Sequence, residues 1–222
     1  MNQEWSERNK RMQALLKKAT FDQGINELIA LRTVLMAEMR AWREALADED
    51  YAKIPFINAE GYHSKTVAYS IWHITRIEDI VVNTLVRARD EVLFSGDFQR
   101  KTASPIITTG NELAKEQIAA FSRALEIDAL YDYAQAVRDD TDRWLRAIRY
   151  DDLKRRFGDD DRERIRRLGV VSPDAQAAWL IDYWCGKDVA GLLKMPLSRH
   201  WIMHIEASGR IISRIGEADK RV

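Results

Sequence analysis

Apolar residues recur at three- and four-residue steps along most of the chain, which is the spacing of one face of an α-helix. The clearest run begins at Thr20 or Asp22 and continues to about Ala47, before Pro55 and Gly61 mark a loop. Its apolar positions are Ile25, Leu28, Ile29, Leu31, Leu35, Met36, Met39, Trp42 and Leu46. This segment is predicted to be a long amphipathic helix.

Three further segments show the same period. Ser64 is placed to cap a helix that runs to about Arg89, and another helix is predicted over residues 128–154. Ser198 is a natural N-cap for a final helix over residues 199–215. The four long segments are predicted to form a four-helix bundle, which is a common scaffold for metal sites built from inward-facing side chains.

The stretches between these segments are predicted to be connectors with short helices of their own. Residues 94–110 are rich in turn formers, and Thr109 or Asn111 is placed to cap a helix that ends near Leu125. The tripeptide Ser172–Asp174 is a helix-start signature because it places a proline at the first helical position. No alternating pattern typical of strands occurs, so the predicted class is all-α.

Length and charge narrow the function classes. A chain of 222 residues can bury about 70% of its unfolded surface, and we expect a single domain over residues 1–222. Its 35 basic and 35 acidic residues give no net field to attract nucleic acid or anionic lipid. In the charged stretch 154–167 both signs interleave, which predicts a solvated loop or a short exposed helix.

Two expectations about compartment and thiol chemistry follow from the same composition. No stretch approaches about 18 apolar residues and the N-terminal segment lacks a signal-peptide core, so a cytoplasmic protein without a membrane segment is expected. The single cysteine, Cys185, excludes an internal disulfide framework and any multi-cysteine zinc site. No histidine accompanies it locally, which favours a small buried hydrophobe over a reactive thiol.

Three of the four histidines suggest a metal site. His200 and His204 have the i,i+4 spacing that puts two imidazoles on one face of a helix, within reach of one ion. His73, on another predicted helix, supplies a third nitrogen if the two helices run parallel and their histidines lie at similar heights. Three imidazoles leave an open coordination position, which favours chemistry over a structural staple. The competing interpretation is a set of core histidines hydrogen-bonded to neighbours.

At this point the chain resembles the DinB superfamily of bacterial four-helix-bundle proteins, including its YfiT-like members. The resemblance is carried by a WHI tripeptide around His73, the acidic residue that follows in RIED, and an H-x-x-x-H pair on the last helix after a PLSRH turn. It implies that His73, His200 and His204 ligate a divalent metal. The chain departs from a minimal member by extra segments at residues 108–125 and 172–195.

The resemblance also implies a function class. A bound metal would lower the pKa of a thiol or of water and present it as a nucleophile, as in a thiol S-transferase, an isomerase or a hydrolase. The expected partners are a small-molecule substrate, including a low-molecular-weight thiol, and a second copy of the chain in a homodimer. Three imidazoles accept Zn, Ni, Fe or Mn, and protons are expected to compete for them below about pH 6.

A non-catalytic function is the second class that the sequence allows. In it, the histidine cluster or its metal only stabilises a non-catalytic, stress-related helical protein that acts through a protein partner. An open coordination position distinguishes the two classes.

Several residues near the histidines in the sequence are predicted to take part in the site. Tyr69 and Arg76 share the helix face of the WHI histidine, where they are expected either to bind substrate or to act as a core tyrosine and a surface ion-pair residue. His63 is expected to line the mouth of the site or to be an exposed loop residue. Glu78 and Asp79 are potential acceptors for an imidazole N–H.

Overall fold

The fold is entirely helical. A computed structural model describes residues 2–219, and within that range the backbone forms helices and turns with no β-strand. The predicted all-α class is therefore confirmed. No helix in this range is long and apolar enough to cross a membrane.

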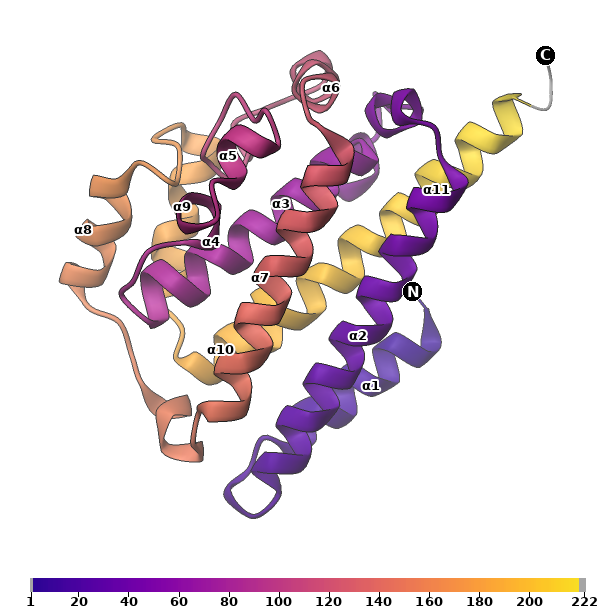
Figure 1. Cartoon of the computed structure of the whole chain (residues 1–222). Coiled ribbons are helices and arrows are strands. Elements are labelled where there is room, and N and C mark those ends of the chain that lie inside the picture. Colours follow the sequence, from indigo (N-terminus) through magenta and orange to yellow (C-terminus); the bar gives the residue numbers. More distant parts are fainter. Residues whose placement is uncertain (1, 220–222) are drawn as a thin grey trace.

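Four long helical segments pack around one another. They are α2 (Phe21–Ala45), α3 (Val67–Asp79), α7 (Ile127–Ala147) and α11 (His200–Asp219). A π-helical turn, η4 (Ile80–Val86), continues α3 without a break. Both α7 and α11 pack against α2 on one side and against α3 on the other, as the arrangement in Figure 1 shows.

The helices that carry the histidines run antiparallel. Near the start of α3, Arg210 donates a hydrogen bond to Nε2 of His63 at 2.9 Å, whereas Ile77, later in α3, shares a cavity with Pro196. Residue numbers therefore rise along α3 while they fall along its neighbour α11 (Figure 1). The parallel arrangement assumed from the sequence is wrong.

The three histidines nevertheless meet, because each lies well inside its own helical segment. A π-helical turn, η6 (Met195–Arg199), precedes α11 and joins it without a break, so His200 is already more than one turn inside that segment. His73 is likewise nearly two turns inside α3. Antiparallel helices bring such inner positions to the same level.

The predicted starts of both histidine-bearing helices are wrong by a few residues. Thr66 rather than Ser64 caps α3, since its hydroxyl accepts from the backbone N–H of Tyr69 at 3.0 Å. Ser64 ends the short turn η3 (Gly61–Ser64). Ser198 lies inside η6, where its hydroxyl donates to the carbonyl of Leu193 instead of capping a helix. Cap preference alone does not distinguish nearby serines and threonines.

The connectors hold more helices than predicted. The helix expected between Thr109 or Asn111 and Leu125 is only α6 (Glu116–Arg123), and both proposed caps lie in the loop before it. Asp174 caps α9 by accepting from the backbone N–H of Gln176. The remaining short elements are η1 (Lys18–Thr20), η2 (Asp48–Ala52), α4 (Val92–Ser95), α5 (Phe98–Lys101), η5 (Tyr150–Lys154), α8 (Asp159–Leu168), α9 (Ala175–Cys185) and α10 (Val189–Lys194). The charged stretch 154–167 falls largely on α8, as the exposed-helix interpretation predicted.

An N-terminal helix, α1 (Gln3–Leu15), was not predicted. It packs along the first half of α2. Gly24 permits this approach, because a Cβ atom at that position would stand 3.0 Å from the carbonyl carbon of Leu15. The low apolar content of α1 explains why its period was not recognised.

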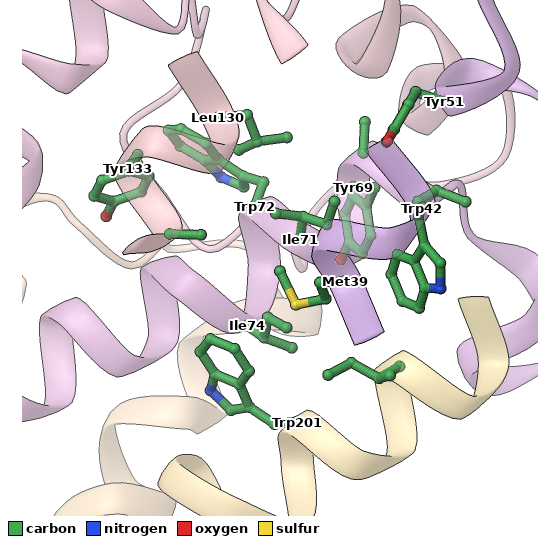
Figure 2. Packing of buried hydrophobic residues seen from close by; sticks show 14 of the residues in the cluster. Met39, Trp42, Tyr51, Tyr69, Ile71, Trp72, Ile74, Leu130, Tyr133 and Trp201 are labelled. Carbon is green, nitrogen blue, oxygen red and sulfur yellow. The ribbon is translucent and has the colours of Figure 1, made fainter. Parts of the chain in front are cut away.

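Buried apolar residues form two clusters. One fills the space between α2, α3, α7 and α11, and Figure 2 shows Trp72, Met39 and Trp201 within it. The other lies under η4 and the connectors α8, α9 and α10, and it includes Cys185. The interpretation of Cys185 as a buried hydrophobe is therefore confirmed.

A buried ion pair joins α2 to two other helices. The guanidinium of Arg32 donates to both oxygens of Glu78, at 2.6 and 2.7 Å, and to Asp142 at 2.8 Å. All three side chains are buried. Such a bidentate contact fixes the register of α2 against α3 and α7.

Candidate metal centre

His73, His200 and His204 converge in the fold. One nitrogen from each ring lies within 4.8 Å of the nitrogens of the other two. The ring centroids are 5.1 Å apart for His73 and His200, 4.8 Å for His73 and His204, and 4.7 Å for His200 and His204. All three side chains are buried. The three histidines therefore lie together, as the sequence predicted.

A backbone carbonyl orients the ring of His73. Its Nδ1 donates to the carbonyl of Thr109 at 2.8 Å, so this nitrogen carries the proton and Nε2 keeps its lone pair. Metal-ligating histidines commonly donate their second N–H to a carbonyl or carboxylate in this way. The ring also stacks on Tyr69, with centroids 5.4 Å apart.

The Thr109 contact belongs to a longer row of hydrogen bonds between α3 and the loop before α6. The four successive carbonyls of residues 107–110 accept, in turn, from Arg76, Trp72, His73 and Tyr69. These donors lie at positions that share one face of α3. The role of the extra segment 108–125 was open from the sequence. Its first residues accept hydrogen bonds from side chains of α3 and so hold the helix that carries His73 in place.

One nitrogen of each of the other two histidines has no hydrogen-bond partner among the described residues. The Nδ1 atoms of His200 and His204 are both buried and unpaired within the described structure. A buried polar atom without a partner costs about 1–3 kcal/mol, so each such atom calls for an explanation. A metal ion coordinated through these Nδ1 atoms, or a water molecule bound to them, would supply one.

The donor set fits a divalent ion. Three nitrogens at 2.0–2.1 Å from a zinc ion in tetrahedral geometry lie about 3.4 Å apart. The observed separations, up to 4.8 Å, differ from this by amounts that rotations about side-chain bonds can close. No carboxylate of the described residues belongs to the cluster. Imidazoles alone suit Zn, Ni or Fe, whereas Mn usually takes oxygen ligands.

Burial keeps the imidazoles neutral. Desolvation lowers the pKa of His73 to about 4, against the Thr109 hydrogen bond, which raises it. Desolvation also holds the pKa values of His200 and His204 well below the usual value, and the neighbouring histidines lower them further. Neutral imidazole is the form that binds metal, so proton competition in the folded protein moves to lower pH than the value of about 6 expected from the sequence.

The cluster opens on a cavity of about 390 Å³, within the range of small-molecule pockets. The histidines form one wall. The remaining walls come from α9, from η6, from α3 and the segment that leads into it, and from Asn111 in the loop before α6. On that segment, the ring of Tyr62 lies edge-on to His204 at a centroid distance of 4.7 Å.

Tyr69 lies where its core interpretation places it. Its side chain is buried and its hydroxyl donates to the carbonyl of Gly110 at 3.1 Å. Burial, with a smaller effect of Glu112, raises the pKa of the phenol. With its donor engaged by the backbone, Tyr69 packs against His73 and borders the cavity without directing its hydroxyl group to it.

Arg76 is not the surface residue that the sequence suggested. It is fully buried, where it donates to the carbonyl of Ile107, to Glu91 and to the hydroxyl of Tyr133. None of these partners borders the cavity. Since these buried groups already engage the guanidinium, Arg76 holds α3 to α7 and to the loop at 107 and does not face a substrate.

The other three predicted neighbours also lie apart from the cluster. His63 is half-buried and pairs with Arg210. Its chain neighbours line the cavity mouth, but His63 does not. Glu78 binds Arg32, and Asp79 accepts from Tyr133, Asn83 and two backbone N–H groups. Neither carboxylate contacts an imidazole, because a backbone carbonyl takes that role.

Sequence reasoning missed several residues of the cavity. Lys65, Tyr62 and Tyr183 all line it, although none belongs to a motif. Lys65 immediately precedes Thr66, the cap of α3. A helix start at Thr66 rather than at Ser64 places Lys65 in the segment that leads into the helix, and this placement is the one indication of its position that the sequence could have given. Tyr183 comes from α9, in the extra segment 172–195.

No protein-family model matches the chain, and no curated protein matches it as a relative.

Proposed function

We propose that this protein is a metal-dependent enzyme in which His73, His200 and His204 hold one divalent ion. The observation that carries the proposal is the set of three buried, neutral imidazoles on the wall of a small-molecule cavity. When bound, such an ion lowers the pKa of a thiol or a water molecule and so generates a nucleophile. The reaction class is thiol transfer, isomerisation or hydrolysis.

The cavity favours an enzyme over a structural metal site. Structural zinc sites are closed by four protein ligands, whereas catalytic ones keep three and leave a position for water or substrate. Here the described residues offer three candidate ligands, and the cavity lies beside them. A non-catalytic, structural metal site would not require a cavity beside the ligands.

The chain's own residues set up the site in three ways. The Thr109 carbonyl fixes the protonated nitrogen of His73, which presents Nε2 to the cluster. The aromatic side chains of Tyr62 and Trp184 border the cavity and limit water around the histidines. Exclusion of water strengthens the electrostatic effect of a charge on a bound group.

The same proposal covers the finer points of the resemblance. It assigns the chain to the DinB superfamily, with α2, α3, α7 and α11 as its four-helix bundle. A low-molecular-weight thiol as substrate and a homodimer belong to this proposal as well. Support comes from the packing of these helices and from the three histidines at the positions that the resemblance implies.

Cobalt(II) spectroscopy tests the proposal, because cobalt occupies zinc sites and its spectrum reports the ligands. We expect metal-free protein to bind cobalt(II) with saturation at one ion per chain. Addition of a low-molecular-weight thiol such as cysteine should then produce a thiolate-to-cobalt charge-transfer band. Azide, an anion that takes the place of hydroxide, should also perturb the spectrum.

Matched variants make the result specific. Replacement His204→Ala should abolish the cobalt spectrum, whereas His63→Ala removes the one histidine outside the cluster and should leave the spectrum unchanged. A cobalt spectrum that responds neither to thiol nor to azide would show a closed site. That outcome would contradict the enzyme proposal and favour a structural metal.

A further inference from the structure

The charges around the cavity are one-sided. Among its lining residues in the described structure, none is an aspartate or a glutamate. Lys65 is the one lysine or arginine among them, and the histidines are neutral. A ligand that enters this space therefore meets positive charge without a compensating carboxylate.

Among residues 2–219, Lys65 itself has no acidic partner. Its ammonium lies over the ring of Tyr69, 5.0 Å from the ring centroid, at the edge of the histidine cluster. Burial lowers the pKa of Lys65, and no neighbouring carboxylate acts against this effect. An ammonium group that is half-buried without a counter-ion is costly, so a lysine held in this way is suited to pair with an anion supplied from outside.

A bound metal would add to this imbalance. Three neutral imidazoles leave both charges of a divalent ion uncompensated by the protein. Lys65 lies close enough to the cluster to lower the pKa values of His73 and His204 by charge repulsion. The lysine and the metal would thus attract the same anionic group.

The wall of the cavity that α9 forms is aromatic and apolar. Trp179 and Tyr183 of α9 contact each other edge-to-face, with ring centroids 5.6 Å apart, and Leu180 lies beside them. Trp179 is 51% exposed, which is unusual for so large an apolar side chain in a folded protein. Aromatic and aliphatic side chains at a cavity wall provide a contact surface for an apolar body.

We propose that the cavity binds a small organic carboxylate, with its carboxylate group at Lys65 and its aromatic or aliphatic body against Trp179 and Tyr183. This carboxylate proposal rests on the proposed function, because it names the class of substrate that the same site would bind. Its Lys65 component is independent of the metal. The two parts can therefore be tested separately.

Isothermal titration calorimetry with matched probes tests the proposal. The probes are 3-phenylpropanoate, its neutral amide 3-phenylpropanamide, and acetate, which lacks the apolar body. Metal-free protein should bind the phenylpropanoate about tenfold or more tightly than either of the other two, because a charged hydrogen bond and an apolar contact each contribute about that much. Protein loaded with zinc should bind the phenylpropanoate more tightly still.

Variants assign the effect to the lysine. Lys65→Gln should weaken binding of the carboxylate about tenfold and leave the amide unchanged, while Lys65→Arg should retain most of the affinity. Lys101→Gln is the matched control, because Lys101 also lies over a ring, that of Phe98, but does not line this cavity. It should bind like the wild type.

The outcomes separate this proposal from the proposed function. Equal affinity of the wild type for carboxylate and amide would overturn the carboxylate proposal, as would full affinity in Lys65→Gln. If the carboxylate binds through Lys65 but the protein takes up no metal, the proposed function fails and the anion site stands. If metal binds and the carboxylate does not, the reverse holds.

Discussion

The buried histidines predict that the metal-free protein loses stability in mild acid. In the folded chain the pKa of His73 is about 4, whereas an exposed imidazole in the unfolded chain has a pKa near 6.5. Between these two values the unfolded chain binds a proton that the folded chain excludes. The free energy of unfolding therefore falls as the pH drops from about 6.5 to about 4, and it is unaffected by His73 above that window.

The size of this effect follows from the pKa difference. A pKa shift of one unit corresponds to about 1.4 kcal/mol, so at pH 5 the contribution of His73 alone is roughly 2 kcal/mol. His200 and His204 have lowered pKa values too, and their contributions have the same sign. For a domain of ordinary stability this is a large share of the total.

Urea denaturation followed by circular dichroism at pH 7.5 and at pH 5, with a chelator present, measures the effect. The variant His73→Gln removes one of the titrating rings, so its loss of stability between the two pH values should be about 2 kcal/mol smaller than that of the wild type. Carboxylates contribute equally to both proteins and cancel in the comparison. An identical pH dependence in wild type and variant would show that folding does not exclude protons from His73, and the buried cluster would be wrong.

Two further predictions concern the supports of the site. Gly110→Ala should destabilise the protein by about 1–2 kcal/mol and weaken metal binding, because Gly110 has φ +78° and a new Cβ would lie 3.0 Å from the Tyr69 ring. Gly169→Ala is the control, since Gly169 has φ +66° and no atom within 4 Å of a new Cβ. It should suffer the same backbone strain but retain its metal affinity in a metal titration. Arg32→Ala should cost about 3–5 kcal/mol in urea denaturation, because it removes the counter-ion of the buried Glu78 and leaves the buried Asp142 paired with Arg138 alone. Arg43→Ala, on the same helix but bound to exposed carboxylates, should cost less than about 1 kcal/mol.

Local patterns predicted the helices well. The apolar period from Thr20 or Asp22 to Ala47 matches α2 (Phe21–Ala45), because a 3.6-residue period is a property of the segment itself. The i,i+4 spacing of His200 and His204 likewise needs only one helix. Within such a segment the sequence carries most of the information.

Relations between segments were harder to predict. The direction of α3 relative to α11 depends on the long connectors between them, and periodicity says nothing about these. Arg76 was assigned to the surface because isolated charges are usually exposed, but its partners Glu91 and Tyr133 come from other segments. A buried charge network cannot be recognised before its members are brought together.

The support of His73 was invisible in the sequence for another reason. The acceptor is the backbone carbonyl of Thr109, and every residue type has such a carbonyl. Glu78 and Asp79 were the predicted acceptors because carboxylates can be recognised in a sequence, but both bind elsewhere. Lys65 escaped attention because a single lysine before a helix carries no motif.

The central claim is that His73, His200 and His204 together hold one divalent ion, and the metal content of the purified protein tests it most directly. Elemental analysis after loading with zinc and removal of free ion should give one ion per chain for the wild type and for His63→Ala. It should give none for His204→Ala or His204→Gln, in protein whose circular dichroism still shows a helical fold. One ion per chain in the folded His204 variants would contradict the three-histidine site.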